Sequence, residues 1–157
     1  MSNHTWPELV LEQWQDTLAT LHMWTQIVGK IRLEQTPLVN HWWNVTLHVT
    51  SRGLTTSPIP DGTHTFSIDF DFIDHRLIIA TSDGAMEQLA LAPMSVAEFH
   101  AHVMARLERL GITVHIWTMP NEIENAVAFD QDRTHASYDA AWVHRFWQAL
   151  LQSDRVL

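Results

Sequence analysis

The sequence predicts an α+β domain in which an antiparallel β-meander carries helices packed on one face. Between residues 43 and 91, apolar and polar residues alternate in steps of two, as in strands with one buried face. The segments before and after this stretch instead repeat apolar residues every three or four positions, as in amphipathic helices. The expected order of elements is therefore roughly α-β-β-β-β-α-β-α.

Composition limits the class of protein. A chain of 157 residues that is 46% hydrophobic fits a single α+β domain over residues 1–157 with a real core. The net charge of −9 and the nine scattered Lys and Arg residues argue against a nucleic-acid partner. The absence of cysteine excludes disulfides, iron–sulfur clusters and thiolate zinc sites. No signal peptide or membrane-length apolar run is visible, so we expect a cytoplasmic protein without a membrane partner.

The first helix is expected to run from about Leu11 to Thr36-Pro37, since proline restricts the residue before it. Its apolar face is built from residues three or four apart: Trp14, Leu18, Leu21, Trp24, Val28 and Ile31. The cluster Asn40-His41-Trp42-Trp43 follows. Because a tryptophan can bury roughly 150–250 Å², we expect this cluster to be partly buried between the first helix and the sheet.

A strand over Trp43–Thr50 is expected to pair with a strand over Thr65–Phe72. The segment between them contains Pro58, Pro60 and Gly62, which indicate a loop or a broken edge strand. A hairpin follows, with its turn at Asp83-Gly84, between strands Arg76–Thr81 and Met86–Leu91.

The remainder is predicted to be mostly helical. Ser95 and Glu98 have the spacing of a capping box, and Gly111 closes the helix that it opens. A further strand is expected over Ile112–Trp117 and an ordered acidic loop over Pro120–Arg133. Asp139 is expected to cap the last helix.

Three groups of polar residues are candidates for a site. His22, Gln26 and Lys30 share one flank of the first helix, with Trp24 beside them as a cleft wall. Arg52 and Asp71 share one face of the sheet, and His135 and Tyr138 precede the last helix. If the groups converge, His135 would act as acid or base, Asp71 would orient it, and Lys30 or Arg52 would hold an anion. A solvated helix flank, the wet face of a sheet and ordinary turn residues explain the same patterns without a site.

Several segments resemble the domain-of-unknown-function family numbered 5996. They are LHMWTQIVGK (Leu21–Lys30), NHWWNV (Asn40–Val45), RGLTTSPIP (Arg52–Pro60), FDFIDHRL (Phe70–Leu77) and HASYD (His135–Asp139). The resemblance implies no activity. It implies that the chain corresponds to the N-terminal half of a longer architecture. It also implies that His48 stands at a position where the family often has an aromatic residue. A half of that kind would expose apolar surface near the last helix, so we expect a homodimer.

The function best matched to these residue types is a small-molecule enzyme of acid–base or hydrolytic type, working in a pocket lined by tryptophan and histidine. The proposed catalytic residues are His135, Asp71 and Tyr138, and the ligand-binding residues are His22, Trp24, Gln26, Lys30 and Arg52. A non-catalytic ligand-binding or self-associating module is one alternative. A metal-dependent hydrolase is another, although no metal ligands stand out and a divalent cofactor is not favoured. No nucleotide-binding motif is present, so the cofactor stays unknown.

Overall fold

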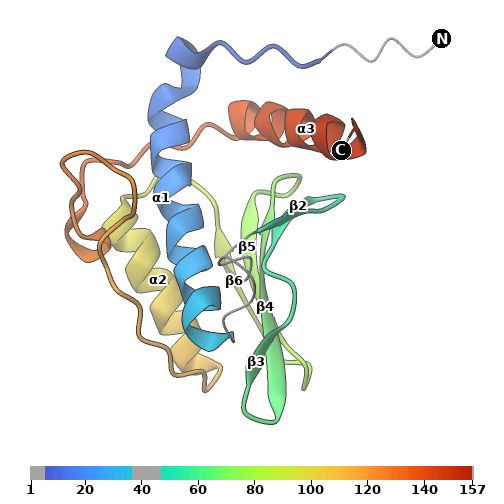
Figure 1. Ribbon diagram of the computed structural model, residues 1–157, viewed down its shortest axis with the longest axis vertical. Helices are drawn as coiled ribbons and strands as arrows, with labels where there is room; N and C mark the ends of the chain where they lie inside the picture. The colour runs from blue at the N-terminus through green and yellow to red at the C-terminus, as the bar shows by residue number, and fades with distance from the viewer. Residues whose placement is uncertain (1–5, 37–46, 157) are drawn as a thin grey trace.

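The computed structural model describes residues 6–36 and 47–156, and it has the predicted α+β architecture (Figure 1). A six-stranded antiparallel sheet carries helices on one face. The helices are α1 (Leu11–Gln35), α2 (Val96–Arg109) and α3 (Ala140–Val156). The strands are β1 (His48–Val49), β2 (Gly53–Thr55), β3 (Ile59–Asp61), β4 (His64–Asp71), β5 (Arg76–Thr81) and β6 (Met86–Ala90).

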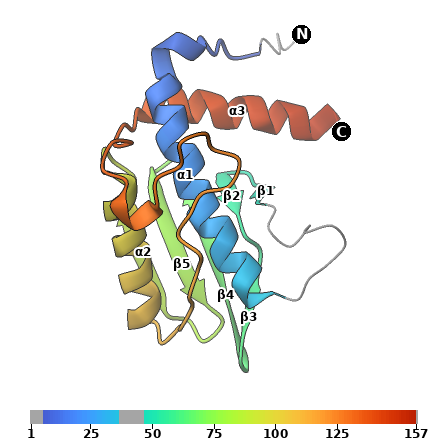
Figure 2. The same cartoon turned by 60° about the vertical axis from the view of Figure 1, so that its left-hand side comes forward.

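The strands lie in the order β1-β2-β4-β5-β6, and β3 pairs with the first half of β4. Leu54, Phe70, Leu77 and Leu89 are register partners across four neighbouring strands, and all four are buried. Because alternate residues of a strand point to opposite faces, this row places the core on the face that α1 and α2 cover (Figure 2).

A glycine allows the short strand β2 to approach β4. A Cβ atom at Gly53 would lie 1.8 Å from the carbonyl oxygen of Phe70, which no side chain could tolerate. Gly53 pairs with Asp71 in the ladder, and the backbone N–H of Phe72 donates to the carbonyl of Arg52 at 2.8 Å. Close backbone contact therefore joins the turn after β1 to the end of β4.

The pairing predicted for the first strand is wrong. β1 pairs with β2, and β2 lies between β1 and β4. The segment with Pro58 and Pro60 is broken as predicted, because it forms the two short strands β2 and β3, which both pair with β4. Residues 43–46 of the predicted strand, like the cluster Asn40-His41-Trp42-Trp43, lie outside the described residues.

The strand predicted over Ile112–Trp117 is also wrong. Ile112 and Val114 are buried and Thr113 and His115 are exposed, so the alternation is real. The carbonyl of Thr113 accepts a hydrogen bond from the Gln35 side chain of α1 at 3.0 Å. None of residues 112–117 belongs to a strand, because alternation reflects burial on one side and does not require a neighbouring strand.

The helix ends agree with the predicted capping chemistry. Ser95 accepts a hydrogen bond from the N–H of Glu98, and Glu98 accepts one from the N–H of Ser95, which completes the capping box. Gly111 follows α2 with φ +75°. The carboxylate of Asp139 accepts hydrogen bonds from Ala141 and Trp142 at the start of α3. None of the described helices is long and apolar enough to cross a membrane.

The third helix has a separate position. α1 and α2 lie side by side on the sheet, whereas α3 crosses the end of the sheet near β1 and β2 (Figures 1 and 2). Only Val143 and Trp147 of its residues are buried, while Phe146 and Leu150 pack against the core at its edge. Both apolar packing and polar contacts with the sheet therefore hold α3 in place.

Candidate functional site

A groove of about 610 Å³ lies between α1, α3 and the β1–β2 edge of the sheet. Its apolar lining comes from all three: Leu18, Leu21, Leu33, Leu47, Val49, Leu54, Phe146 and Leu150. Its polar lining lies along α1 and on the loop after α2: His22, Thr25, Gln26, Lys30, Asn121 and Glu122. We call this cavity the α1–α3 groove. Its volume falls in the range of about 300–1,000 Å³ that is typical of small-molecule sites.

One rim of the groove is a loop that two α1 side chains hold in place. The Gln26 amide bonds the backbone of Asn121 twice, donating to its carbonyl at 3.0 Å and accepting from its N–H at 2.8 Å. The Lys30 ammonium donates to the Met119 carbonyl at 2.7 Å and to the Asn121 side chain at 3.2 Å. The helix flank expected from the sequence is therefore a docking edge for residues 119–121 as well as a groove wall.

Aromatic rings complete the surroundings of Lys30. Its ammonium lies 5.0 Å from the centre of the Trp117 ring and 5.7 Å from the centre of the Phe129 ring. Burial disfavours the charged form and lowers the pKa of Lys30, and the nearby Glu34 carboxylate opposes this effect. Lys30 is the only lysine of the chain.

Arg52 and Asp71 meet as predicted, at the turn between β4 and β5. Arg52 Nε donates to the Asp71 carboxylate at 2.9 Å, and its Nη2 donates to Asp74 at 2.9 Å. Burial opposes ionisation of Asp71. Hydrogen bonds from the N–H groups of Asp74 and Ile73 and from Arg52 outweigh it, so the pKa of Asp71 is lowered. Arg76 lies 3.6–3.7 Å from the same two carboxylates, which makes this a closed ionic network.

Tyr138 and Trp24 belong to the core beside this network. The Tyr138 ring stacks on the Trp24 ring with centres 5.5 Å apart, and Trp24 stacks on Phe99 at 4.6 Å. Trp24 is fully buried and does not line the groove, so it does not form the predicted cleft wall. The Tyr138 hydroxyl lies 2.7 Å from His75 Nδ1, and burial raises the pKa of Tyr138.

His135 has a carboxylate partner, but a different one from that predicted. Its Nδ1 lies 2.6 Å from Asp132 Oδ2, and the other Asp132 oxygen accepts from the N–H groups of Thr134 and His135. The Asp132 side chain is 4% exposed and that of His135 is 39% exposed. A buried carboxylate thus orients a partly exposed imidazole, as in acid–base pairs of enzymes.

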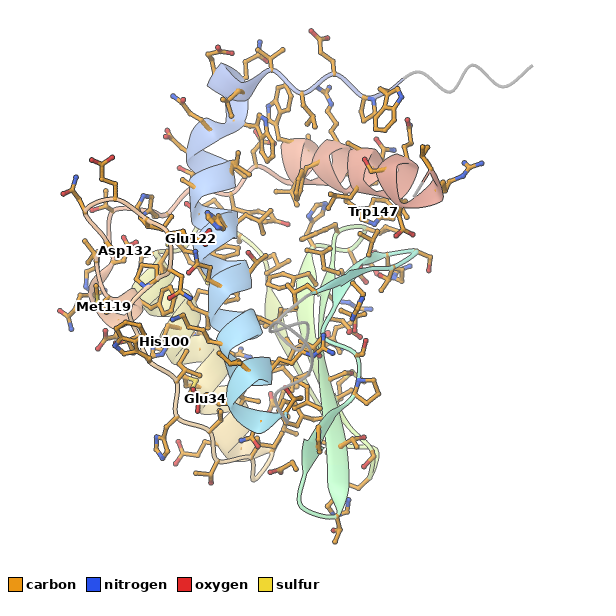
Figure 3. All side chains as sticks on the ribbon, in the orientation of Figure 1. Glu34, His100, Met119, Glu122, Asp132 and Trp147 are labelled. Carbon is orange, nitrogen blue, oxygen red and sulfur yellow. The ribbon has the colours of Figure 1, made fainter. Side chains whose placement is uncertain are left out.

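The predicted site residues therefore occupy three separate places. His22, Gln26 and Lys30 line the α1–α3 groove. Arg52, Asp71 and Tyr138 lie around the β4–β5 turn, and His135 lies on the loop before α3, where it pairs with Asp132. Asp132 and Trp147 of α3 lie on opposite sides of α1 in Figure 3.

Four residues that organise these places were not predicted from the sequence: His75, Asn121, Asp132 and His144. Asp132 carries a usable signal, because it precedes His135 by three residues in a loop, within reach of a side-chain contact. His75 gives only the signal of a turn. Asn121 and His144 have no local signal, since their partners lie 95 and 72 positions away.

No described group of three His, Asp or Glu side chains in residues 6–36 and 47–156 could hold a metal ion. The metal-dependent alternative therefore lacks a ligand set in this part of the chain.

Fold and site together define an α+β protein with a groove of ligand size, one wall of which is the last helix, α3. Residues 6–157 match the model of a family described as a family of unknown function (DUF5996), and the chain belongs to that family. The match covers essentially the whole chain, which corrects the narrower description of the chain as an N-terminal half. No curated protein matches the chain, and no solved structure matches it.

Proposed function

We propose that the protein binds a small molecule with an apolar body and an acidic or strongly accepting end in the α1–α3 groove. One observation carries the proposal: an apolar groove of about 610 Å³ has the only lysine of the chain in its wall. A largely apolar pocket with a few polar groups that fix orientation is the usual form of such a site.

The polar groups of the groove favour a ligand whose polar end is negatively charged or accepts hydrogen bonds. An ammonium has three N–H donors, and two of those of Lys30 are used by Met119 and Asn121. The third is available to an acceptor on a ligand, as judged from the contacts of the described residues. His22 lies one helical turn before Gln26 in the same wall and is exposed. Glu122 lies in the rim loop directly after Asn121, and it would disfavour a second ligand carboxylate placed close to it.

Calorimetric titration with decanoate tests this proposal, because decanoate joins an alkyl chain to a carboxylate. We expect saturable binding at neutral pH. Decyltrimethylammonium, with the opposite charge on the same chain, should bind at least about tenfold more weakly, a difference of about 1.4 kcal/mol. Equal binding of both amphiphiles would reduce the groove to an unspecific apolar surface. No saturable heat with either one would remove the proposal.

Two variants locate the binding. Thr25→Phe places a ring in the groove and should weaken decanoate binding by about tenfold or more, because it removes the space for the alkyl chain. Gln15→Phe adds the same ring to an exposed position of α1 that does not line the groove, and it should leave the affinity unchanged. If both variants bind like the wild type, decanoate binds elsewhere.

A second candidate function is acid–base catalysis, and the His135–Asp132 pair favours it. The carboxylate is buried, has fixed hydrogen-bond partners and holds the ring at 2.6 Å, which leaves Nε2 as the proton-transferring atom. A panel of hydrolysable esters and amides, assayed with His135→Gln and with Asp132→Asn, tests it. Turnover by the wild type that both variants lose, with unchanged circular dichroism, supports catalysis. Turnover that survives His135→Gln assigns the pair to loop structure.

A further inference from the structure

Three side-chain contacts connect α3 and the segment before it to the sheet, and two of them involve a histidine. His144 Nδ1 lies 3.2 Å from the carbonyl oxygen of Phe72, at the end of β4. Trp147 donates from its indole N–H to the carbonyl of Thr50 at 3.0 Å. Just before α3, the hydroxyl of Tyr138 lies 2.7 Å from Nδ1 of His75. We call these three contacts the α3 clamp.

The backbone at His75 supports a specific role for this residue. Its φ of +51° lies in the left-handed region, which is uncommon for residues other than glycine, although asparagine, aspartate and histidine adopt it more often than the rest. The imidazole packs edge-on against Tyr138 with ring centres 5.8 Å apart. Such backbone conformations persist where the surrounding contacts compensate for their cost.

The groups around His75 do not favour a positive charge on it. The ring is partly buried, and His144 is near enough that a charge on one imidazole disfavours a charge on the other. Asp71 and Asp74 act in the opposite direction, but Arg52 and Arg76 neutralise both carboxylates. Burial and His144 prevail, and they lower the pKa of His75.

Protonation would also change the hydrogen bonding of the clamp. The buried Tyr138 phenol is neutral and can donate to His75 only while Nδ1 of His75 is unprotonated. Once that nitrogen carries a proton, it becomes the donor to the phenol oxygen and the hydrogen bond reverses. The phenol O–H must then find another acceptor in a buried place, or it stays unsatisfied and the clamp is weakened. His144 donates from Nδ1 to the Phe72 carbonyl, so the change acts mainly through His75.

The clamp has a direct connection to the groove. Phe146 and Leu150 of α3 form part of the groove lining, and they flank Trp147 on the same helix. A shift of α3 away from the sheet would remove this wall and expose the groove to solvent. Two side chains of α3 are buried, and Phe146, Leu150 and Leu151 pack partly buried against the core, so such a shift has to break these apolar contacts together with the clamp.

We propose that His75 and His144 form a pH-sensitive clamp that keeps α3 on the sheet at neutral pH and releases it, with the ligand of the groove, under mild acid. The release of the ligand rests on the function proposed above, whereas the movement of α3 does not. The histidines therefore regulate the groove from outside it, by controlling one of its walls.

Hydrogen exchange of the ligand-free protein tests the clamp alone. Between about pH 7.5 and pH 5.5, where histidine titrates, amide exchange in α3 should accelerate by about 5-fold or more after correction for the intrinsic rate. Exchange in β6, which contains no histidine, should not. The double variant His75→Asn and His144→Asn should lose this pH dependence, because asparagine tolerates the left-handed backbone and does not titrate. His115→Asn, at an exposed position, should keep it.

Decanoate titrations over the same range test the coupling. The wild type should lose about 5-fold or more in affinity at the lower pH, and the double variant should not. Unchanged α3 exchange in the wild type overturns the clamp, whatever decanoate does. If α3 responds but decanoate binds at neither pH, the clamp stands and the proposed function fails. If the double variant does not fold, the single variant His75→Asn provides the comparison, and a full wild-type response from it also overturns the clamp.

Discussion

Nδ1 of His75 lies 2.7 Å from the hydroxyl oxygen of Tyr138, although 63 positions of sequence separate the two residues. The contact joins the turn between β4 and β5 to the segment that leads into α3. It also links this histidine to the core, since Tyr138 stacks on the fully buried Trp24.

Stability against unfolding should decrease in mild acid partly because of His75. Burial first, and His144 second, lower its pKa in the folded state below the usual 6.5. The unfolded chain therefore binds the proton more readily, so stability falls as pH drops through about 6.5 towards the folded value. Urea unfolding from about pH 7.5 to pH 5 should show a shallower decline in His75→Asn than in the wild type. Parallel curves would contradict this.

Replacing Asp71 by asparagine should destabilise the fold by roughly 1–3 kcal/mol at neutral pH. The amide keeps one oxygen for the N–H groups of Ile73 and Asp74, but it loses the charge that pairs with Arg52. Because the folded pKa of Asp71 is lowered, its contribution is present above about pH 4 and is lost as pH falls towards that lower value. Urea unfolding measures the loss, and the exposed Asp154→Asn should show none.

Lys30→Met should loosen the loop that forms the groove rim. The variant keeps the approximate length of the side chain but removes the donors to Met119 and Asn121, at a cost of about 1 kcal/mol. We expect faster hydrogen exchange in residues 117–123 and unchanged exchange in β4 and β5. An unaltered loop would mean that Gln26 alone holds it, which the double variant with Gln26→Leu would show.

Gly53→Ala should be far more destabilising than alanine at a neighbouring position. The added Cβ would meet the backbone oxygen of Phe70 at 1.8 Å, so β2 must move away from β4, at a cost of about 1–3 kcal/mol or more. Thermal unfolding of Gly53→Ala and of Ser51→Ala, which is exposed, makes the comparison. Equal melting temperatures would show that β2 can shift without loss.

The homodimer expected from the sequence stays a prediction. Several apolar side chains are more than half exposed, among them Trp117 at 68% and Val156 of α3 at 78%. Val156 is the last residue of α3, where the expected interface lies. Light scattering over a range of protein concentrations decides the question. A constant monomer mass at high concentration would remove the expectation.

Local chemistry determined the elements that could be predicted from the sequence. The capping box of Ser95 and Glu98, the cap at Asp139 and the turn at Asp83-Gly84 depend on residues within three or four positions of each other. The periodicity of β4 and β5 likewise follows from which side chains face the core. The prediction at Ile112–Trp117 is wrong for the same reason: one buried side produces alternation whether or not a strand partner exists.

Tertiary structure alone decided how the polar residues were grouped. The pairs His75–Tyr138 and Gln26–Asn121 join residues 63 and 95 positions apart, and no local pattern encodes such distances. The sequence identified His22, Gln26 and Lys30 as one flank because helical geometry relates residues four apart. It placed His135 with Asp71, whereas His135 pairs with Asp132 three residues earlier in the same loop, a local contact that the spacing could have indicated. Helical and strand periods constrain neighbours on one element, and the packing of α3, the loop and the sheet decides which elements share a site.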